Sequence, residues 1–156
     1  MKHIKLFESF ETKSQIYYHT SDNKFDKFEL KTGYRTHGLS VEKTPSFAIF
    51  VTPDIQASKQ YGSKYLYEVS IKCNKIIDWT EYLDEESYVY ISKLNIIPND
   101  SSDYWMLLDD IRVIKYLKNR KIDCVKLEEY SEIYDVFTTF AVLNPNDVKI
   151  NNIIKL

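Results

Sequence analysis

The stretch FAIFVTPDIQASKQYG (Phe47–Gly62) carries the clearest signals for the class of fold. Its first five residues form a short apolar run that is typical of a strand. The remainder has the expected signals of a helix, because Thr52 suits the N-cap and Pro53 suits the first helical position. Gly62 stands where a left-handed C-cap is wanted. The stretch therefore predicts a strand that leads directly into a short helix.

The segment that follows, Tyr65–Cys73 (YLYEVSIKC), alternates between two sets of side chains. Such alternation predicts a half-buried strand. One face is expected to carry Tyr65, Tyr67, Val69, Ile71 and Cys73. Further strands are expected over Ile16–Thr20, Ile122–Leu127, Val136–Leu143 and Val148–Ile154.

Helices and loops fill the rest of the chain. Residues 1–14 form an N-terminal amphipathic segment, and residues 15–156 a single domain. Ser101–Leu117 is the strongest predicted helix, capped by Ser101 or Ser102. Its apolar stripe is formed by Leu107, Ile111, Ile114 and Leu117. Because strands and helices do not alternate strictly, we predict an α+β fold.

Three other segments are less regular. Asp78–Asn99 is expected to hold one helix and a loop closing at Pro98, and Ser21–Glu29 a loop with a turn of helix. Lys31–Pro45 looks most like a loop. The basic run KNRK (Lys118–Lys121) complements the dipole at the end of the strongest helix, which favours a structural role.

Composition and charge exclude several classes of function. The 156 residues carry a net charge of -2, so no global basic field exists to hold nucleic acid. No apolar run is long enough to cross a bilayer, and Met1–Phe10 does not resemble a secretory signal. The two cysteines, Cys73 and Cys124, are expected to be reduced thiols. We therefore expect a soluble protein of the cytoplasm without a membrane partner.

Few side chains offer recognisable chemistry. The three histidines, His3, His19 and His37, lack a zinc spacing, so no metal site is predicted. His19 ends a predicted strand and Tyr61 ends a predicted helix, and both positions suit contact with a ligand. Each also has a structural alternative, namely a hydrogen-bonded core histidine and a packing tyrosine.

Five segments taken in order resemble a known superfamily. They are YYHTSDNKFDKF (Tyr17–Phe28), FAIFVTPDIQASKQYG (Phe47–Gly62), YLYEVSIKCNKIID (Tyr65–Asp78), KIDCVKL (Lys121–Leu127) and FTTFAVLNPNDVKI (Phe137–Ile150). Together they resemble the His-Tyr-Glu branch of the ADP-ribosyltransferase superfamily. That branch includes diphtheria-type toxins, the poly-ADP-ribose polymerases and the small transferase domains of phage polyvalent proteins. The resemblance covers most of residues 17–150.

The resemblance implies a fold and a set of roles. The fold is a split, twisted β-sheet with short flanking helices and an NAD cleft between its halves. His19 would hydrogen-bond the nicotinamide-side ribose, and Tyr61 would stack on the nicotinamide ring, the two converging on one dinucleotide. Thr20 and Ser21 would take part in cofactor binding, with the backbone around Thr20 holding the carboxamide. Arg35 or His37 would meet the pyrophosphate, on the basis of charge.

The third catalytic position departs from the family pattern. The family's glutamate lies eight residues before a glutamine, and Asp147 takes the glutamine-like position here, which places Thr139 where the glutamate belongs. Losing one aimed electrostatic group typically costs about 10²–10³ in rate. A carboxylate of the acceptor would be one alternative source of charge, in a slow mono-transferase. A neighbouring acid would be another, from Glu128, Glu129, Glu132 or Asp135. The segment LEEYSEIYD (Leu127–Asp135) is otherwise most simply a solvated acidic loop.

The leading hypothesis is an NAD-dependent mono-ADP-ribosyltransferase, with NAD as substrate and no metal. His19, Tyr61 and Thr139 are its candidate catalytic residues, and the acceptor is a macromolecule, a protein in preference to a nucleic acid. An inactive module that binds NAD, ADP-ribose or a protein is the alternative. An unrelated α+β ribonuclease or inhibitor, using His19 or His37 as general base, is a third possibility. The opening MKHIKLFESF resembles that of many proteins of large tailed phages, which would make the compartment the host cytoplasm.

Overall fold

The computed structural model describes residues 15–30, 33–37, 40–44 and 47–156. Strands and helices both contribute, so the α+β class is confirmed. The strands of this part are β1 (Tyr17–Ser21), β2 (Gly33–His37), β3 (Ser40–Thr44), β4 (Ile49–Val51), β5 (Tyr65–Ile71), β6 (Ile76–Asp78), β7 (Cys124–Ser131), β8 (Asp135–Val142) and β9 (Val148–Lys155). The helices are α2 (Glu85–Ser92) and α3 (Ile111–Asn119), with the 3-10 helices η1 (Ala57–Tyr61), η2 (Ser101–Asp109) and η3 (Pro145–Asp147).

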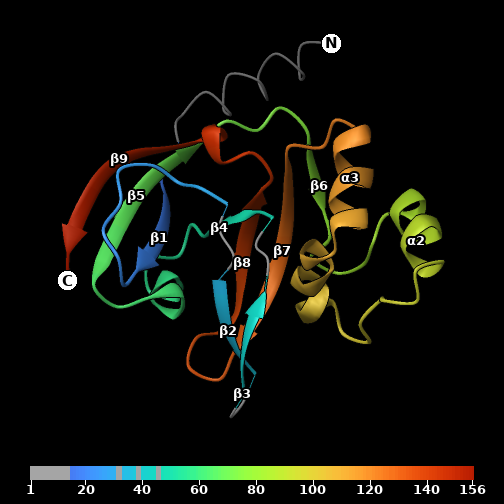
Figure 1. Cartoon of the computed structure of the whole chain (residues 1–156), viewed down its shortest axis with the longest axis horizontal. Coiled ribbons are helices and arrows are strands. Elements are labelled where there is room, and N and C mark those ends of the chain that lie inside the picture. The colour runs from blue at the N-terminus through green and yellow to red at the C-terminus, as the bar shows by residue number, and fades with distance from the viewer. Residues whose placement is uncertain (1–14, 31–32, 38–39, 45–46) are drawn as a thin grey trace, which may run out of the picture.

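Two sheets make up most of the molecule. The strand order is β1-β5-β9 in the three-stranded sheet and β4-β8-β7-β6 in the four-stranded sheet. The sheets lie on opposite sides of the view in Figure 1, with α2, α3 and η2 beside the larger one. They are joined where β1 meets the residue after β4, since Tyr18 and Thr52 exchange backbone hydrogen bonds of 2.7 and 3.0 Å. This bridge fixes the end of β1 against the larger sheet.

The core is divided in the same way as the sheets. One cluster of buried side chains lies under the helices and includes Trp79, Leu117 and Leu127. The other lies between the two sheets and includes Tyr67, Val51 and Cys124. Burying a large apolar side chain contributes about 1.5–3 kcal/mol, so both clusters stabilise the fold strongly.

The expected strand Tyr65–Cys73 is present as β5, and its alternation is reflected in burial. Tyr67 and Val69 are fully buried. Leu66, on the other face, is also buried, so β5 is covered on both sides along part of its length.

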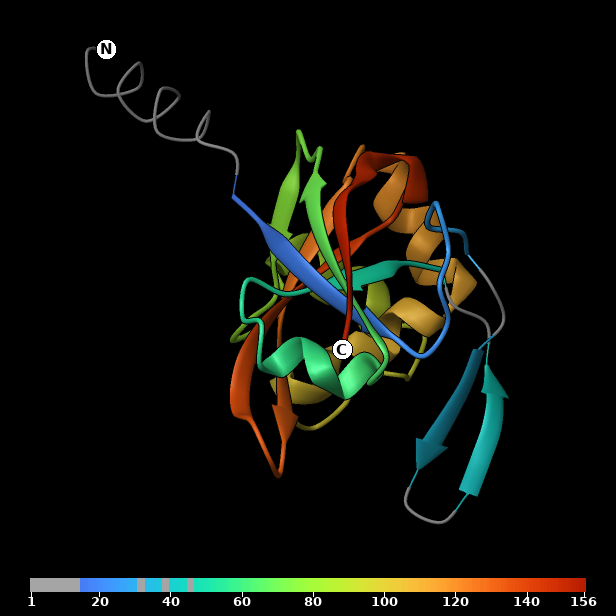
Figure 2. The ribbon, with the colours of Figure 1, turned by 90° about the vertical axis from the view of Figure 1, so that its left-hand side faces the viewer.

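The prediction of a loop over Lys31–Pro45 is wrong. Its described residues form two paired antiparallel strands, β2 and β3. Figure 2 shows this hairpin projecting from the side of the molecule. The segment has turn-forming glycines but no strong apolar pattern, which is why a strand was not expected there.

The expected helix over Thr52–Gly62 is also shorter than predicted. Only η1 is helical, and Thr52 is engaged in the bridge to β1. The N-cap residue of η1 is Gln56, which makes no side-chain cap hydrogen bond. Just before it, the Asp54 carboxylate accepts hydrogen bonds from the backbone N–H groups of Gln56 and Ala57 at 2.8 and 3.1 Å.

Gly62 is not the left-handed C-cap that the sequence suggested. Its φ of 169° is extended backbone. A Cβ at this position would lie 2.6 Å from backbone atoms of Ser21. Glycine is therefore needed because the chain passes very close to the end of β1.

The strongest predicted helix is interrupted. Asp110 ends η2 and caps α3, its carboxylate accepting a hydrogen bond from the Arg112 N–H at 2.9 Å. Asp100, rather than Ser101 or Ser102, caps the first part. Of the predicted stripe, Ile111 is 43% exposed, because the break turns it away from the core.

Other expectations have mixed outcomes. Within Ser21–Glu29 no helical turn occurs. Leu127–Asp135 is not a loop but the end of β7, a turn and the start of β8. Arg120, in the basic run, contacts Asp84 at 3.0 Å and Glu86 at 3.2 Å, as a structural role requires.

The expected amphipathic segment of residues 1–14 lies outside the described residues. Across the part of the chain that is described, no helix combines the length and apolar character needed to cross a bilayer.

Candidate functional site

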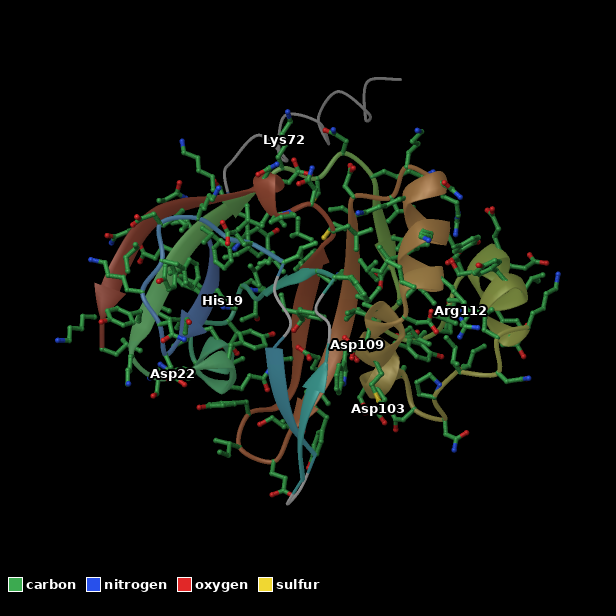
Figure 3. All side chains as sticks on the ribbon, viewed as in Figure 1. His19, Asp22, Lys72, Asp103, Asp109 and Arg112 are labelled. Atoms are coloured by element: carbon green, nitrogen blue, oxygen red, sulfur yellow. The ribbon has the colours of Figure 1, made fainter. Side chains whose placement is uncertain are left out.

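His19 lies in the middle of β1, opposite Tyr67 of β5, on the side of the molecule formed by the smaller sheet and η1 (Figure 3). Its Nδ1 is 2.8 Å from the carbonyl oxygen of Phe50. A carbonyl oxygen only accepts hydrogen bonds, so Nδ1 carries the proton and donates. The other ring nitrogen, Nε2, then holds a lone pair when the imidazole is neutral.

Aromatic rings surround this imidazole. Tyr61 stacks on it with ring centroids 5.4 Å apart and planes 11° from parallel. Phe28 meets it edge-on at 5.2 Å, and Phe25 and Tyr67 lie farther out at 6.5 and 6.4 Å. Desolvation by these neighbours lowers the pKa of His19, and its hydrogen bond to Phe50 opposes the shift. The side chain is therefore neutral at pH 7 and fixed in orientation.

The hydroxyl of Tyr61 reaches the larger sheet. It donates a hydrogen bond to Oε2 of Glu129 at 2.9 Å and lies 3.2 Å from Oγ1 of Thr139. Oγ1 of Thr139 donates to the same Glu129 oxygen at 2.6 Å. Burial, followed by the nearby charge of Glu129, raises the pKa of Tyr61 well above its usual value. The phenol therefore stays protonated and acts as a donor.

Strand register explains how Glu129 arrives there. β7 and β8 are antiparallel, with Leu127 opposite Thr139 and Glu129 opposite Phe137. Side chains of directly opposed residues share a face, and residues two positions apart also share it. Glu129 is thus the diagonal neighbour of Thr139. η1 presents Tyr61 to this pair.

Of the acids proposed as substitutes for the missing glutamate, Glu129 is the one that contacts Tyr61 and Thr139. Glu128 belongs to the opposite face of β7, because it pairs with Thr138. Glu132 lies in the turn and Asp135 begins β8, opposite Ser131. Only the register of β7 against β8 distinguishes Glu129 from the neighbouring acids.

Thr139 itself is fully buried. Its hydroxyl donates a hydrogen bond to the Glu129 carboxylate and so helps to fix the position of that side chain. The sequence comparison had suggested instead that Thr139 replaces the carboxylate directly.

Thr20 and Ser21 lie at the end of β1. Thr20 is fully buried, and its hydroxyl is 3.0 Å from that of Ser58 in η1. The hydroxyl of Ser21 accepts a hydrogen bond from the Asn23 N–H at 3.1 Å. The Thr20 side chain therefore joins β1 to η1, and the role of the backbone around Thr20 in ligand binding stays a prediction.

The two candidates for a pyrophosphate contact fall in β2. In the register of β2 against β3, Arg35 lies opposite Glu42 and His37 lies opposite Ser40. Their side chains lie outside the described part, so their assignment to a ligand stays a prediction.

The structure places the rings of His19 and Tyr61 next to each other. The two residues do converge, but they stack directly on each other at 5.4 Å. No third ring fits between them.

Metal ligands do not gather in the described residues, which hold no group of three or more His, Cys, Asp or Glu side chains suited to a metal ion. Comparison with protein-family models, with curated proteins and with solved structures finds no match for this chain.

Proposed function

We propose that this chain is an NAD-dependent mono-ADP-ribosyltransferase that modifies a macromolecule, most simply a protein. Two sheets joined by the Tyr18–Thr52 bridge suit the split sheet of that superfamily. The motif residues His19 and Tyr61, which lie 5.4 Å apart, support the same assignment.

His19 offers one hydrogen-bond acceptor. With Nδ1–H bonded to Phe50, the neutral ring presents Nε2, which accepts from a hydroxyl and has no charge to attract an anion. A ribose hydroxyl is the group of NAD that matches it.

Tyr61 offers an aromatic surface. The ring is half-buried, and its stacking on His19 and its bond to Glu129 fix its plane. Nicotinamide stacks on the face turned away from His19, which contributes about 0.5–1.5 kcal/mol beyond area burial.

The observation that carries the proposal is the convergence of Tyr61 and Thr139 on one oxygen of Glu129. This places a carboxylate beside the ring that would stack on nicotinamide. When the glycosidic bond breaks, nicotinamide leaves with the bonding electrons and positive charge develops on the ribose. The Glu129 carboxylate stabilises that charge and accepts the proton of the acceptor nucleophile as it bonds to the ribose carbon.

Incubation of the purified chain with labelled NAD and a cell lysate tests the proposal. Transfer of label to a macromolecule together with release of nicotinamide is the expected result. If neither occurs, the chain is not an ADP-ribosyltransferase for the acceptors in that lysate. Absence of NAD hydrolysis at high enzyme concentration would extend that conclusion to water as acceptor.

A non-catalytic module that binds NAD or ADP-ribose is the second candidate. It is favoured by the direct contact of His19 with Tyr61 and by the full burial of Thr139. Calorimetric titration with NAD separates the two, because a module binds without turnover. Absence of binding leaves only a protein-interaction role.

A further inference from the structure

The two cysteines, 51 positions apart in numbering, lie together between the two sheets. Cys124 begins β7 and is fully buried in the cluster that also holds Val51 and Tyr67. Cys73 follows β5, is half-buried and packs against the same cluster.

Hydrogen bonds hold the segment after β5 beside the segment before β7. The carboxylate of Asp123 accepts from the N–H groups of Asn74 and Lys75 at 2.8 and 2.9 Å. In return, the Asp123 N–H donates to the Lys75 carbonyl at 2.9 Å. Each cysteine therefore directly adjoins a residue of this junction, Cys73 beside Asn74 and Cys124 beside Asp123.

The Cys73 thiol also affects the ionisation of Cys124. The pKa of the Cys124 thiol is raised, first by its hydrogen bond with the Cys73 thiol and then by burial. Cys73 is the less buried of the two, so its exposed part is the point of access for an oxidant, and Cys124 is the neighbouring thiol.

We propose that Cys73 and Cys124 form a reversible disulfide when the protein meets a peroxide. The Cys73 sulfur attacks one peroxide oxygen, giving a sulfenic acid and one water. The Cys124 sulfur then attacks the Cys73 sulfur, and the sulfenic oxygen leaves with the thiol proton as a second water. Both sulfurs are oxidised by one electron each, and the peroxide is the two-electron oxidant. The bond links the segment that follows β5 in one sheet to the start of β7 in the other.

The inference stands apart from the proposed function, since it uses none of the residues of the proposed site. Its test needs no substrate. The reduced, native full chain is treated with hydrogen peroxide, denatured, exposed to iodoacetamide and weighed as an intact protein. The expected product is a monomer that has lost two hydrogen atoms, carries no alkyl group and regains two reactive thiols after treatment with dithiothreitol.

Two variants sharpen the experiment. Cys73→Ser leaves only the buried thiol, and we expect no loss of hydrogen and one alkylated cysteine after denaturation. Cys124→Ala leaves only the half-buried thiol, and we expect the sulfenic acid to persist long enough to be trapped by dimedone. Cys73→Ser removes a side chain that is not fully buried, so it remains informative even if the core variant fails to fold.

Three results for the wild-type chain would overturn the inference. One is a monomer that gains oxygen atoms at Cys73 without losing two hydrogens. Another is a disulfide-linked dimer as the main product. The third is retention of two alkylatable thiols under conditions in which a control thiol of ordinary reactivity has been oxidised by the same peroxide.

Discussion

The phenol of Tyr61 donates a hydrogen bond of 2.9 Å to the carboxylate of Glu129, although 68 positions separate the two residues. This contact ties η1 to β7. Because Thr139 of β8 donates to the same oxygen, three distant segments meet at one carboxylate. The position of Glu129 therefore depends on two hydroxyl groups that can each be removed alone.

Removal of the Tyr61 hydroxyl is the mildest such change. Tyr61→Phe keeps the ring that stacks on His19 and deletes the donor to Glu129. We expect unfolding free energy to fall by about 1.5–3 kcal/mol, since a hydrogen bond to a charged group is lost. Affinity for NAD should fall by less than about tenfold, because the stacking surface remains.

Urea denaturation and calorimetry measure these two effects. Tyr130→Phe is the matched control, because Tyr130 lies next to Glu129 in β7 and is 59% exposed. Its stability should stay within about 0.5 kcal/mol of wild type. Equal losses in both variants would show that the Tyr61 hydroxyl has no special role.

The close approach at Gly62 gives a second prediction. Gly62→Ala places a Cβ 2.6 Å from the Ser21 backbone, which cannot move aside as a flexible side chain would. We expect a loss of about 1–3 kcal/mol or more in unfolding free energy, as for other overpacked sites.

Chemical denaturation again provides the measurement. Lys59→Ala, at an exposed position of η1, is the control and should change stability by no more than about 0.5 kcal/mol. A fully stable Gly62→Ala protein would mean that η1 and β1 are not held as closely as described.

The histidine at the centre of the site makes stability depend on pH. Burial lowers the pKa of folded His19 below its ordinary 6.5. As the pH falls below 6.5, the unfolded chain takes up a proton that the folded chain refuses, so stability declines until the folded pKa is reached. Above that window the contribution of the neutral ring is complete.

Thermal unfolding of wild type and His19→Asn between about pH 7 and pH 5 tests this sign. Asparagine keeps an N–H donor for the Phe50 carbonyl but does not titrate. As the pH falls, the melting temperature of wild type should decrease by more than that of the variant. Parallel curves would show that His19 has an unperturbed pKa.

Local patterns predicted much of this fold. The alternation in Tyr65–Cys73 gave β5, because one face of that strand packs on the core. The class, and most strands, follow from such short-range signals. The helix over Ser101–Leu117 failed because Asp110 caps α3 in the middle of an apolar repeat, and side-chain capping overrides periodicity there.

Only part of the candidate site could be predicted from the sequence. His19 and Tyr61 could be chosen as candidates because each ends or occupies a recognisable element. Glu129 stood in a run of acids with nothing to distinguish it. Its contact with Thr139 is set by the register of β7 against β8, a long-range property that one sequence does not encode locally.

The most direct test of the central claim is the rate of nicotinamide release from NAD by wild type, Glu129→Gln and Glu128→Gln. Glu129→Gln keeps the size of the side chain and removes its charge, so we expect the rate to fall by about 10²–10³ with little change in NAD affinity. Glu128→Gln, on the opposite face of the same strand, should release nicotinamide at the wild-type rate. Equal rates in all three proteins would contradict the assignment of Glu129 as the carboxylate that supports the reaction.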